Sequence, residues 1–296
     1  IMMPGMDGYE VCKSLKDDPL TSQIPVIFIS AMNELSYEKK GLDLGAVDFI
    51  SKPFNPDIVL RRIKTHIELY DQNRALAYQV KEYTEELLET RIEIINRLGR
   101  VSELKDNETG MHIVRMSHYS RLIAELLDET DDWKELLFQV AAMHDIGKVG
   151  IPDHILLKPG KFEPEEWEIM KKHSQYGGDI IGNHHSDIMK MAKEVALYHH
   201  EKWDGSGYPY GLVSEDIPLS ARIVAIADVF DALTSDRPYK KAWSFEKTMA
   251  YINEQSGVQF DPTLVPLFNQ QQDKVIVIMN EFKDLDAMHI IQTIEL

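Results

Sequence analysis

The chain has 296 residues, of which 44% are hydrophobic and 27% charged, a balance that is typical of globular proteins and excludes a chain disordered throughout. Its 49 acidic and 32 basic residues give a formal net charge of −17, which argues against nonspecific nucleic-acid binding. The single cysteine, Cys12, excludes an internal disulfide and a cysteine-based metal site, and it favours a reducing, cytoplasmic location.

The length exceeds that of one typical domain and predicts two. No apolar run approaches the roughly 20 residues that cross a bilayer, so we expect no transmembrane helix and no membrane partner. The opening residues, IMMPGMDGYE, have neither the positive start nor the apolar core of a signal peptide, and we expect the chain to be cut from a longer one.

Residues 1–66 have an α/β pattern. Apolar runs predict buried strands at 26–30 and 46–51, with helical stretches at 8–17, 34–44 and 56–66. This region resembles the second half of a two-component receiver domain, because it has MMPGMDGYE at its start, Ser30 at the end of one strand and Lys52-Pro53 at the end of the next.

By this resemblance, the phosphoacceptor aspartate would fall immediately before Ile1, so phosphorylation is not predicted for the chain as given. Ser30 and Lys52 would contact the phosphoryl group, the Lys52-Pro53 bond would be cis, and a cognate sensor kinase would be a partner. The residues alone also allow an ordinary strand-end hydroxyl and a solvated lysine. Two strands rarely form a stable sheet, so we expect further strands upstream in the parent protein.

Residues 67–103 lack proline and are rich in Glu, Leu, Arg and Tyr, which predicts one long helix. Two seven-residue series interleave along it: Leu69, Leu76, Tyr83 and Thr90, and Val80, Leu87, Ile94 and Val101. Such heptads predict a parallel coiled coil, so we expect a homodimer in which this linker passes a signal between domains. The alternative is a single helix that packs on one neighbour.

Residues 104–296 have an almost entirely helical pattern, with Gly- and Pro-containing loops at 147–160, 203–218 and 256–262. The expected fold class is therefore mainly α. An all-helical bundle over 104–296 follows the coiled-coil linker at 67–103 and an incomplete α/β receiver domain at 1–66.

Most histidines and several acidic residues of the helical region lie close to one another in sequence. Glu108 and His112 are four residues apart, which places both on one face of a helix, although this spacing is common by chance. His144-Asp145 follows an apolar stretch, where a buried carboxylate must be paired or metal-bound; a helix-end His-Asp hydrogen bond is the alternative. Lys148 lies one turn further on and can point the same way, or be a solvated helix-terminal lysine.

Three further positions complete the candidate set. His199-His200 ends a helical stretch, and Asp228 follows five apolar residues, where a hydrogen-bonded core aspartate is the alternative. His173 alone would usually be a helix-surface histidine. The five imidazoles and three carboxylates are Glu108, His112, His144, Asp145, His173, His199, His200 and Asp228. This is too many ligands for one ion, so we infer at least a dinuclear site and favour a trinuclear one.

These motifs are very similar to those of the HD-GYP family, the helical metal-dependent phosphodiesterases of bacterial cyclic di-GMP signalling. The HD pair is His144-Asp145, and the GYP triplet is Gly207-Tyr208-Pro209 within HHEKWDGSGYP. The match runs from about residue 104 to residue 262, with the separated motifs in the same order.

The resemblance implies that all eight candidate residues bind metal, that Asp145 bridges two ions and that Glu108 marks members able to hold a third. It also implies that Lys148 faces the scissile phosphate, that Arg237 and Lys240 grip the substrate's phosphates and guanine, and that the GYP loop walls the pocket. From composition alone, GSGYP can also be a plain glycine-rich turn.

The implied activity is hydrolysis of cyclic di-GMP to linear pGpG, with slower cleavage to GMP in an open trinuclear site. Two or three divalent ions are implied, with iron or manganese favoured and nickel or zinc also compatible with these donors. Two alternatives stay open: a phosphohydrolase acting on another cyclic or linear nucleotide, and an adaptor module that binds cyclic di-GMP without cleaving it. The complete ligand set argues against the adaptor.

Overall fold

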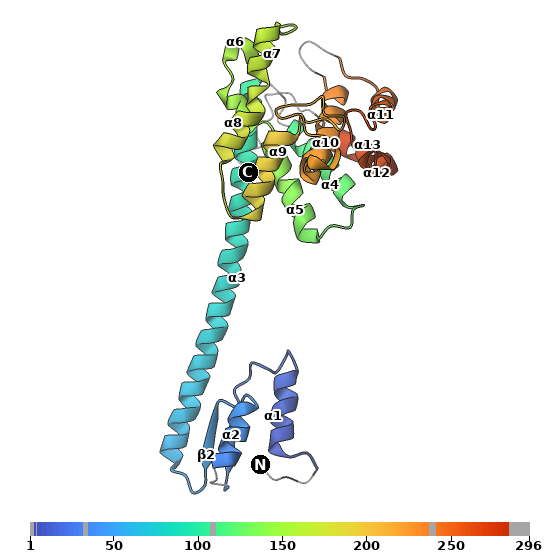
Figure 1. Cartoon of the computed structure of the whole chain (residues 1–296). Helices are drawn as coiled ribbons and strands as arrows, with labels where there is room; N and C mark the ends of the chain where they lie inside the picture. Colours follow the sequence, from blue (N-terminus) through green and yellow to red (C-terminus); the bar gives the residue numbers. More distant parts are fainter. Residues whose placement is uncertain (1–2, 4, 32–34, 107–110, 237–240, 284–296) are drawn as a thin grey trace. The chain divides into compact units, whose positions relative to one another are not determined.

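The computed structural model describes residues 3, 5–31, 35–106, 111–236 and 241–283, and it divides into two compact units, Ile1–Leu88 and Glu89–Leu296 (Figure 1). Within these described residues, no helix is both long enough and apolar enough to cross a membrane. The predicted division into domains at residues 66 and 103 stays a prediction.

The first unit has the predicted α/β arrangement. Its elements are α1 (Gly8–Asp17), β1 (Ile27–Ser30), α2 (Leu35–Asp43), β2 (Asp48–Ser51) and the start of α3 (Pro56–Asp106). The two strands are parallel, and their register pairs Ile27 with Asp48 and Ser30 with Ser51. The Lys52-Pro53 peptide bond is cis, as the receiver resemblance predicts.

A capping box and a small core hold this unit together. The Asp7 side chain accepts hydrogen bonds from the backbone N–H groups of Tyr9 and Glu10, and the Glu10 carboxylate accepts one from the Asp7 N–H in return. Buried side chains from both helical and strand segments then form one cluster: Tyr9, Cys12, Phe28, Ala46 and Phe49.

α3 is a single helix of 51 residues, and it merges the two helices that the sequence predicted at 56–66 and 67–103. The two stretches join without interruption because no proline or glycine lies between residues 57 and 98 to interrupt the backbone hydrogen bonds. The heptad residues Leu76, Val80 and Leu87 are 57%, 64% and 70% exposed in the single chain.

The second unit is built from helices, and its described residues contain no β-strand. After the end of α3, its elements are α4 (His112–Ala124), α5 (Asp131–Val140), η1 (Ala141–Met143), η2 (Ile146–Gly150), α6 (Asp153–Leu156), α7 (Pro164–Met170), α8 (Lys172–Ile181), α9 (Asp187–Tyr198), η3 (Ser214–Asp216), α10 (Leu219–Thr234), α11 (Phe245–Glu254), α12 (Leu264–Gln270) and α13 (Gln272–Glu281). The mainly helical fold class is confirmed.

α4, α5, α9 and α10 pack against one another around the core of this unit. Tyr119 of α4 and Phe268 of α12 both make edge contacts with Phe230 of α10, with ring centroids 5.0 and 5.2 Å apart. α10 is apolar around most of its circumference and is therefore largely buried. Its acidic residues Asp228 and Asp231 consequently need polar partners inside the fold.

Candidate metal centre

The HD pair lies where two short 3-10 helices meet. His144 and Asp145 connect η1 to η2, and their side chains are only 2% and 14% exposed. η2 approaches α8 so closely that a Cβ atom on Gly147 would lie 1.9 Å from the carbonyl oxygen of His173. Only glycine fits there, and the close packing brings Asp145 beside α8.

A first ligand group gathers around Asp145. Its members are Asp145, His173, His199 and His200, whose candidate ligand atoms all lie within 4.8 Å of one another. Oδ1 of Asp145 is 3.3 Å from Nε2 of His173 and 3.6 Å from Nε2 of His199. His173 comes from the start of α8 and His199 from the end of α9, so three separate segments converge here.

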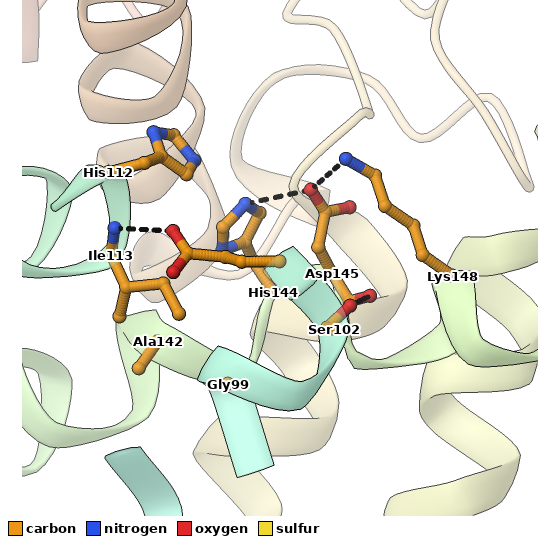
Figure 2. A pocket seen from close by; sticks show the side chains of 9 residues that line it. Gly99, Ser102, His112, Ile113, Ala142, His144, Asp145 and Lys148 are labelled. Atoms are coloured by element: carbon orange, nitrogen blue, oxygen red, sulfur yellow. Dashed lines mark hydrogen bonds and ion pairs between the residues drawn. The ribbon is translucent and has the colours of Figure 1, made fainter. Parts of the chain in front are cut away.

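A second ligand group lies on the other side of the same carboxylate. It consists of His112, His144 and Asp228, whose candidate ligand atoms also lie within 4.8 Å of one another. Nε2 of His144 is 3.1 Å from Oδ2 of Asp145, the ion-pair contact dashed in Figure 2, and 4.0 Å from Oδ1 of Asp228. The two oxygens of Asp145 therefore face different groups, which is the geometry of a bridging ligand.

The hydrogen bonds of the imidazoles fit metal ligation. Nδ1 of three site histidines lies beside a backbone carbonyl of the preceding turn: His144 beside Ala141 (3.0 Å), His173 beside Met170 (2.7 Å) and His199 beside Val195 (3.0 Å). Because a carbonyl only accepts, each Nδ1 carries the proton and each Nε2 has a lone pair. None of these three buried Nε2 atoms makes a hydrogen bond of good geometry within the described residues.

These lone pairs face carboxylate oxygens, an arrangement that is repulsive unless a cation lies between them. Imidazole nitrogen and carboxylate oxygen together suit divalent transition metals. Beside His112, His144 and Asp145 there is also a cavity of about 10 Å³, which is about the space of one water-sized group. The residues present therefore fit bound divalent metal ions.

Burial sets the charge state of the first group. Burial lowers the pKa of His173 to about 4 against the opposing effect of Asp145, and it lowers the pKa of His200 well below its usual value. For Asp145, burial alone would raise the pKa, but Lys148 and His144 hold it well below its usual value. Neutral imidazoles at His173 and His200 beside an ionised Asp145 are the protonation states that metal binding requires.

The second group has a different electrostatic balance. Burial acts to lower the pKa of His144, but the nearby carboxylates of Asp145 and Asp228 outweigh burial and raise it. In the absence of a metal, this imidazole therefore holds a proton more readily than His173 does.

Lys148 lies against the carboxylate of Asp145. Its Nζ is 2.7 Å from Oδ2 of Asp145 and also pairs with Asp106, at the end of α3, and its side chain is only 13% exposed. Ser102, one turn earlier in α3, donates a hydrogen bond to the carbonyl oxygen of Asp145. The lysine is thus ion-paired and mostly buried, unlike the solvated lysine that the sequence left open.

The GYP loop covers the first ligand group. The ring centroid of Tyr208 is 4.7 Å from that of His200, and the Tyr208-Pro209 bond is cis. Buried Glu201 accepts hydrogen bonds from the N–H groups of Tyr210 (2.8 Å) and Leu212 (3.1 Å), which anchors the loop beyond the triplet. Burial, together with Asp145 and Asp228, raises the pKa of Tyr208, so its hydroxyl stays protonated at neutral pH.

The structure brings together seven of the eight predicted ligands, which are His112, His144, Asp145, His173, His199, His200 and Asp228. Glu108, Arg237 and Lys240 lie outside the described residues. Lys148, Tyr208 and Pro209 are placed as stated above, and Gly207 packs against the backbone of Glu201 and Lys202.

Sequence reasoning missed Asp106, Glu201 and Asp231, which contact site residues or the GYP loop, and Arg115, which is ion-paired with Asp231. Two of them had a usable signal. Asp231 follows Asp228 by three residues in the same apolar helix, and Glu201 directly follows the histidine pair.

Comparison with known families agrees with this geometry. A model of the HD domain matches residues 93–264, and a model of the response regulator receiver domain matches residues 1–64. The chain belongs to the HD-domain family. The predicted combination of an HD-GYP type domain with a receiver segment is thereby confirmed, and an HD domain implies divalent metal binding.

Relatives of this HD-domain chain include phosphodiesterases. A Vibrio cholerae serotype O1 protein named "Probable cyclic di-GMP phosphodiesterase" is 40% identical over 97% of this chain and 70% of the relative. The "Cyclic di-GMP phosphodiesterase response regulator RpfG" of Xanthomonas campestris is 37% identical over 96% of this chain and 77% of the relative. A solved structure of a Vibrio cholerae cyclic GMP-AMP phosphodiesterase shares the fold, with a TM-score of 0.50 at 19% identity over 68% of this chain and 53% of that chain.

Proposed function

We propose that this chain is a metal-dependent phosphodiesterase that hydrolyses cyclic di-GMP to linear pGpG. The observation that carries the proposal is the position of Asp145, whose two carboxylate oxygens face two separate groups of ligands. The names of the relatives that align over nearly the whole chain support the choice of substrate.

We propose two or three divalent ions, with iron or manganese favoured and nickel or zinc also compatible with the donors. The first ligand group would hold one ion and the second group another, and Glu108 would serve a third. Such ions activate water and polarise the oxygens of a phosphodiester. Asp145 would then be shared, because its oxygens already face both groups.

The chain's own residues would bind and orient the substrate. Lys148 carries a mostly buried cation beside the bridging carboxylate, where it would offset charge that develops on the phosphoryl group. Gly207, Tyr208 and Pro209 would form a wall of the substrate pocket. The protonated Tyr208 hydroxyl would donate a hydrogen bond to the substrate. Arg237 and Lys240 would grip phosphate and guanine, so a local cluster of cations would let a protein of net charge −17 bind a dianion.

The first unit and α3 would regulate this activity. A receiver domain is the segment that a sensor kinase addresses, so a cognate kinase is the proposed partner. The exposed heptad residues Leu76, Val80 and Leu87 would pair with a second copy of the chain along residues 67–103. Light scattering of the full chain in solution would report that dimer directly.

Anaerobic purification, elemental analysis and chromatography of the products test the proposal. The metal-loaded chain is expected to convert cyclic di-GMP to pGpG, and slower appearance of GMP would indicate the second cleavage. Cyclic GMP-AMP and mononucleotides, offered at the same concentration, should turn over more slowly. Tight binding of cyclic di-GMP without any product would instead identify an adaptor, and faster turnover of another nucleotide would identify a different phosphohydrolase.

A further inference from the structure

His112 is held differently from other histidines of the metal centre. Its Nδ1 lies 2.8 Å from Oδ2 of Asp231, a side chain on α10, whereas the Nδ1 contacts described above for His144, His173 and His199 are to backbone carbonyls. His112 is the first residue of α4, and the side chain that holds it lies 119 residues further along the chain.

Asp231 is itself firmly fixed. It is 1% exposed, and Arg115 grips both its oxygens, with Nε 2.6 Å from Oδ1 and Nη2 2.9 Å from Oδ2. Arg115 also donates hydrogen bonds to the Ser235 hydroxyl (2.8 Å) and the Phe282 carbonyl oxygen (2.9 Å). Because both oxygens of Asp231 accept from the Arg115 guanidinium, the carboxylate is held as the ionised acceptor of this ion pair and can only accept from His112.

The same helix supplies the acidic partner on the opposite edge of the ring. Asp228 and Asp231 are three residues apart on α10, a spacing that puts them on one face of the helix. Nε2 of His112 is 3.6 Å from Oδ1 of Asp228, while Nδ1 faces Asp231. Donation from Nδ1 to Asp231 therefore leaves the Nε2 lone pair directed toward the second ligand group.

We propose that Asp231 is a positioning residue of the metal centre, which fixes the tautomer and orientation of His112 and so strengthens metal binding by the second ligand group. It acts through His112, as carboxylates that accept from a ligating histidine do in other metal sites. The inference rests on the metal centre of the proposed function and is independent of which nucleotide is cleaved.

The test uses the full chain, stripped of metal and titrated with Mn²⁺, with free Mn²⁺ measured by electron paramagnetic resonance. Removing Asp231 alone would take away the carboxylate that is ion-paired with the buried Arg115 cation, a change that strongly destabilises a fold. The main variant is therefore D231L/R115M, which replaces both charged partners by apolar side chains. We expect its Mn²⁺ affinity at one class of sites to fall by about 10- to 100-fold, with the other class unchanged.

A matched variant, D231N/R115M, also lacks the ion pair but keeps an oxygen that can accept from Nδ1 of His112. We expect it to bind Mn²⁺ within a few-fold of wild type, although both double variants should have similar melting temperatures. In a His112→Ala background, D231L/R115M should cause no further loss of affinity. The readout is Mn²⁺ binding alone, so failure to hydrolyse cyclic di-GMP would not affect the result.

Three results would overturn the proposal. The first is wild-type Mn²⁺ binding by D231L/R115M. The second is an equal loss in both double variants, which would assign the effect to the ion pair and hence to a purely structural role. The third is a further loss in the His112→Ala background, which would show that Asp231 does not act through that histidine.

Discussion

The two ligand groups obtain similar donors by different means. In the first group, His173 and His199 are oriented by backbone carbonyls of the preceding turn, so local chain geometry fixes them. In the second group, His144 is oriented in the same local way, but His112 is oriented by a side chain of α10 that lies 119 residues away in sequence. The second group thus depends on tertiary packing, and substitutions outside the ligand set should affect it more.

Asp145 contacts histidines of both ligand groups, so its replacement should weaken metal binding by both groups alike. We expect Asp145→Ala to lower kcat by at least about 10³-fold and to reduce the content of both metals, with the helical content retained. Product chromatography, elemental analysis and circular dichroism measure these effects. Asp179→Ala, at an exposed position of α8, is the control. A wild-type rate in Asp145→Ala would refute the bridging role.

The metal-free protein should lose stability in acid through the first group. The pKa of folded His173 is about 4 against an ordinary 6.5, so at intermediate pH the unfolded chain binds a proton that the folded chain does not. The contribution of His173 is therefore full above pH 6.5 and falls as the pH drops toward 4, by at most about 3 kcal/mol.

Urea unfolding of the metal-free chain between pH 7 and pH 4 measures this change. His173→Gln lacks the titrating ring and should show a shallower fall over the same window. Identical pH profiles for the variant and the wild type would contradict the expectation.

His112→Ala should separate the two groups. It removes a ligand from the second group only, so we expect the loss of one metal per chain, retention of the other, and a fall in kcat of about 10²-fold. His118→Gln is the matched control on the same helix, because the ring of His118 stacks on Phe282 and lies outside both groups. Loss of both metals in His112→Ala would show that the groups do not bind independently.

Glu201→Gln should have the smallest effect and should spare the metals of both groups. The Gln side chain keeps one oxygen, which can accept from one of the two backbone N–H groups. Its NH2 group would face the other N–H, and two donors cannot form a hydrogen bond, so the loop that carries Tyr208 should loosen. We expect kcat/KM for cyclic di-GMP to fall by about 10-fold, the cost of one or two hydrogen bonds, at unchanged metal content. Glu215→Gln, at an exposed position in η3, should match wild type. Reduced metal content in Glu201→Gln would place the residue in the metal centre instead.

The sequence predicted much of the site because its signals are local. His144-Asp145 and His199-His200 are adjacent pairs, and Asp228 stands out as a charge after an apolar run. Composition and periodicity also predicted the helical stretches at 56–66 and 67–103, which the structure joins into α3.

Sequence reasoning could not predict the ion-pair partners of site residues that lie far away along the chain. The ion pair of Asp231 with Arg115 spans 116 residues, and its formation depends on the packing of α4 against α10, which no local pattern encodes. Asp106 similarly meets Lys148 across 42 residues, because the end of α3 reaches η2 only in the folded unit. Such contacts are decided by tertiary structure, whereas the ligands themselves are marked by residue type.

Gly147 sets the spacing between η2 and α8, because it has only a hydrogen atom where other residues have a Cβ atom. Because the neighbour of Gly147 is main chain, no rotamer change elsewhere can make room for a larger residue there. An alanine at this position would force η2 away from α8 and so increase the distance between Asp145 and His173. The spacing between Asp145 and His173 is thus set by a residue that has no side chain, and substitutions among the candidate ligands would not restore that spacing.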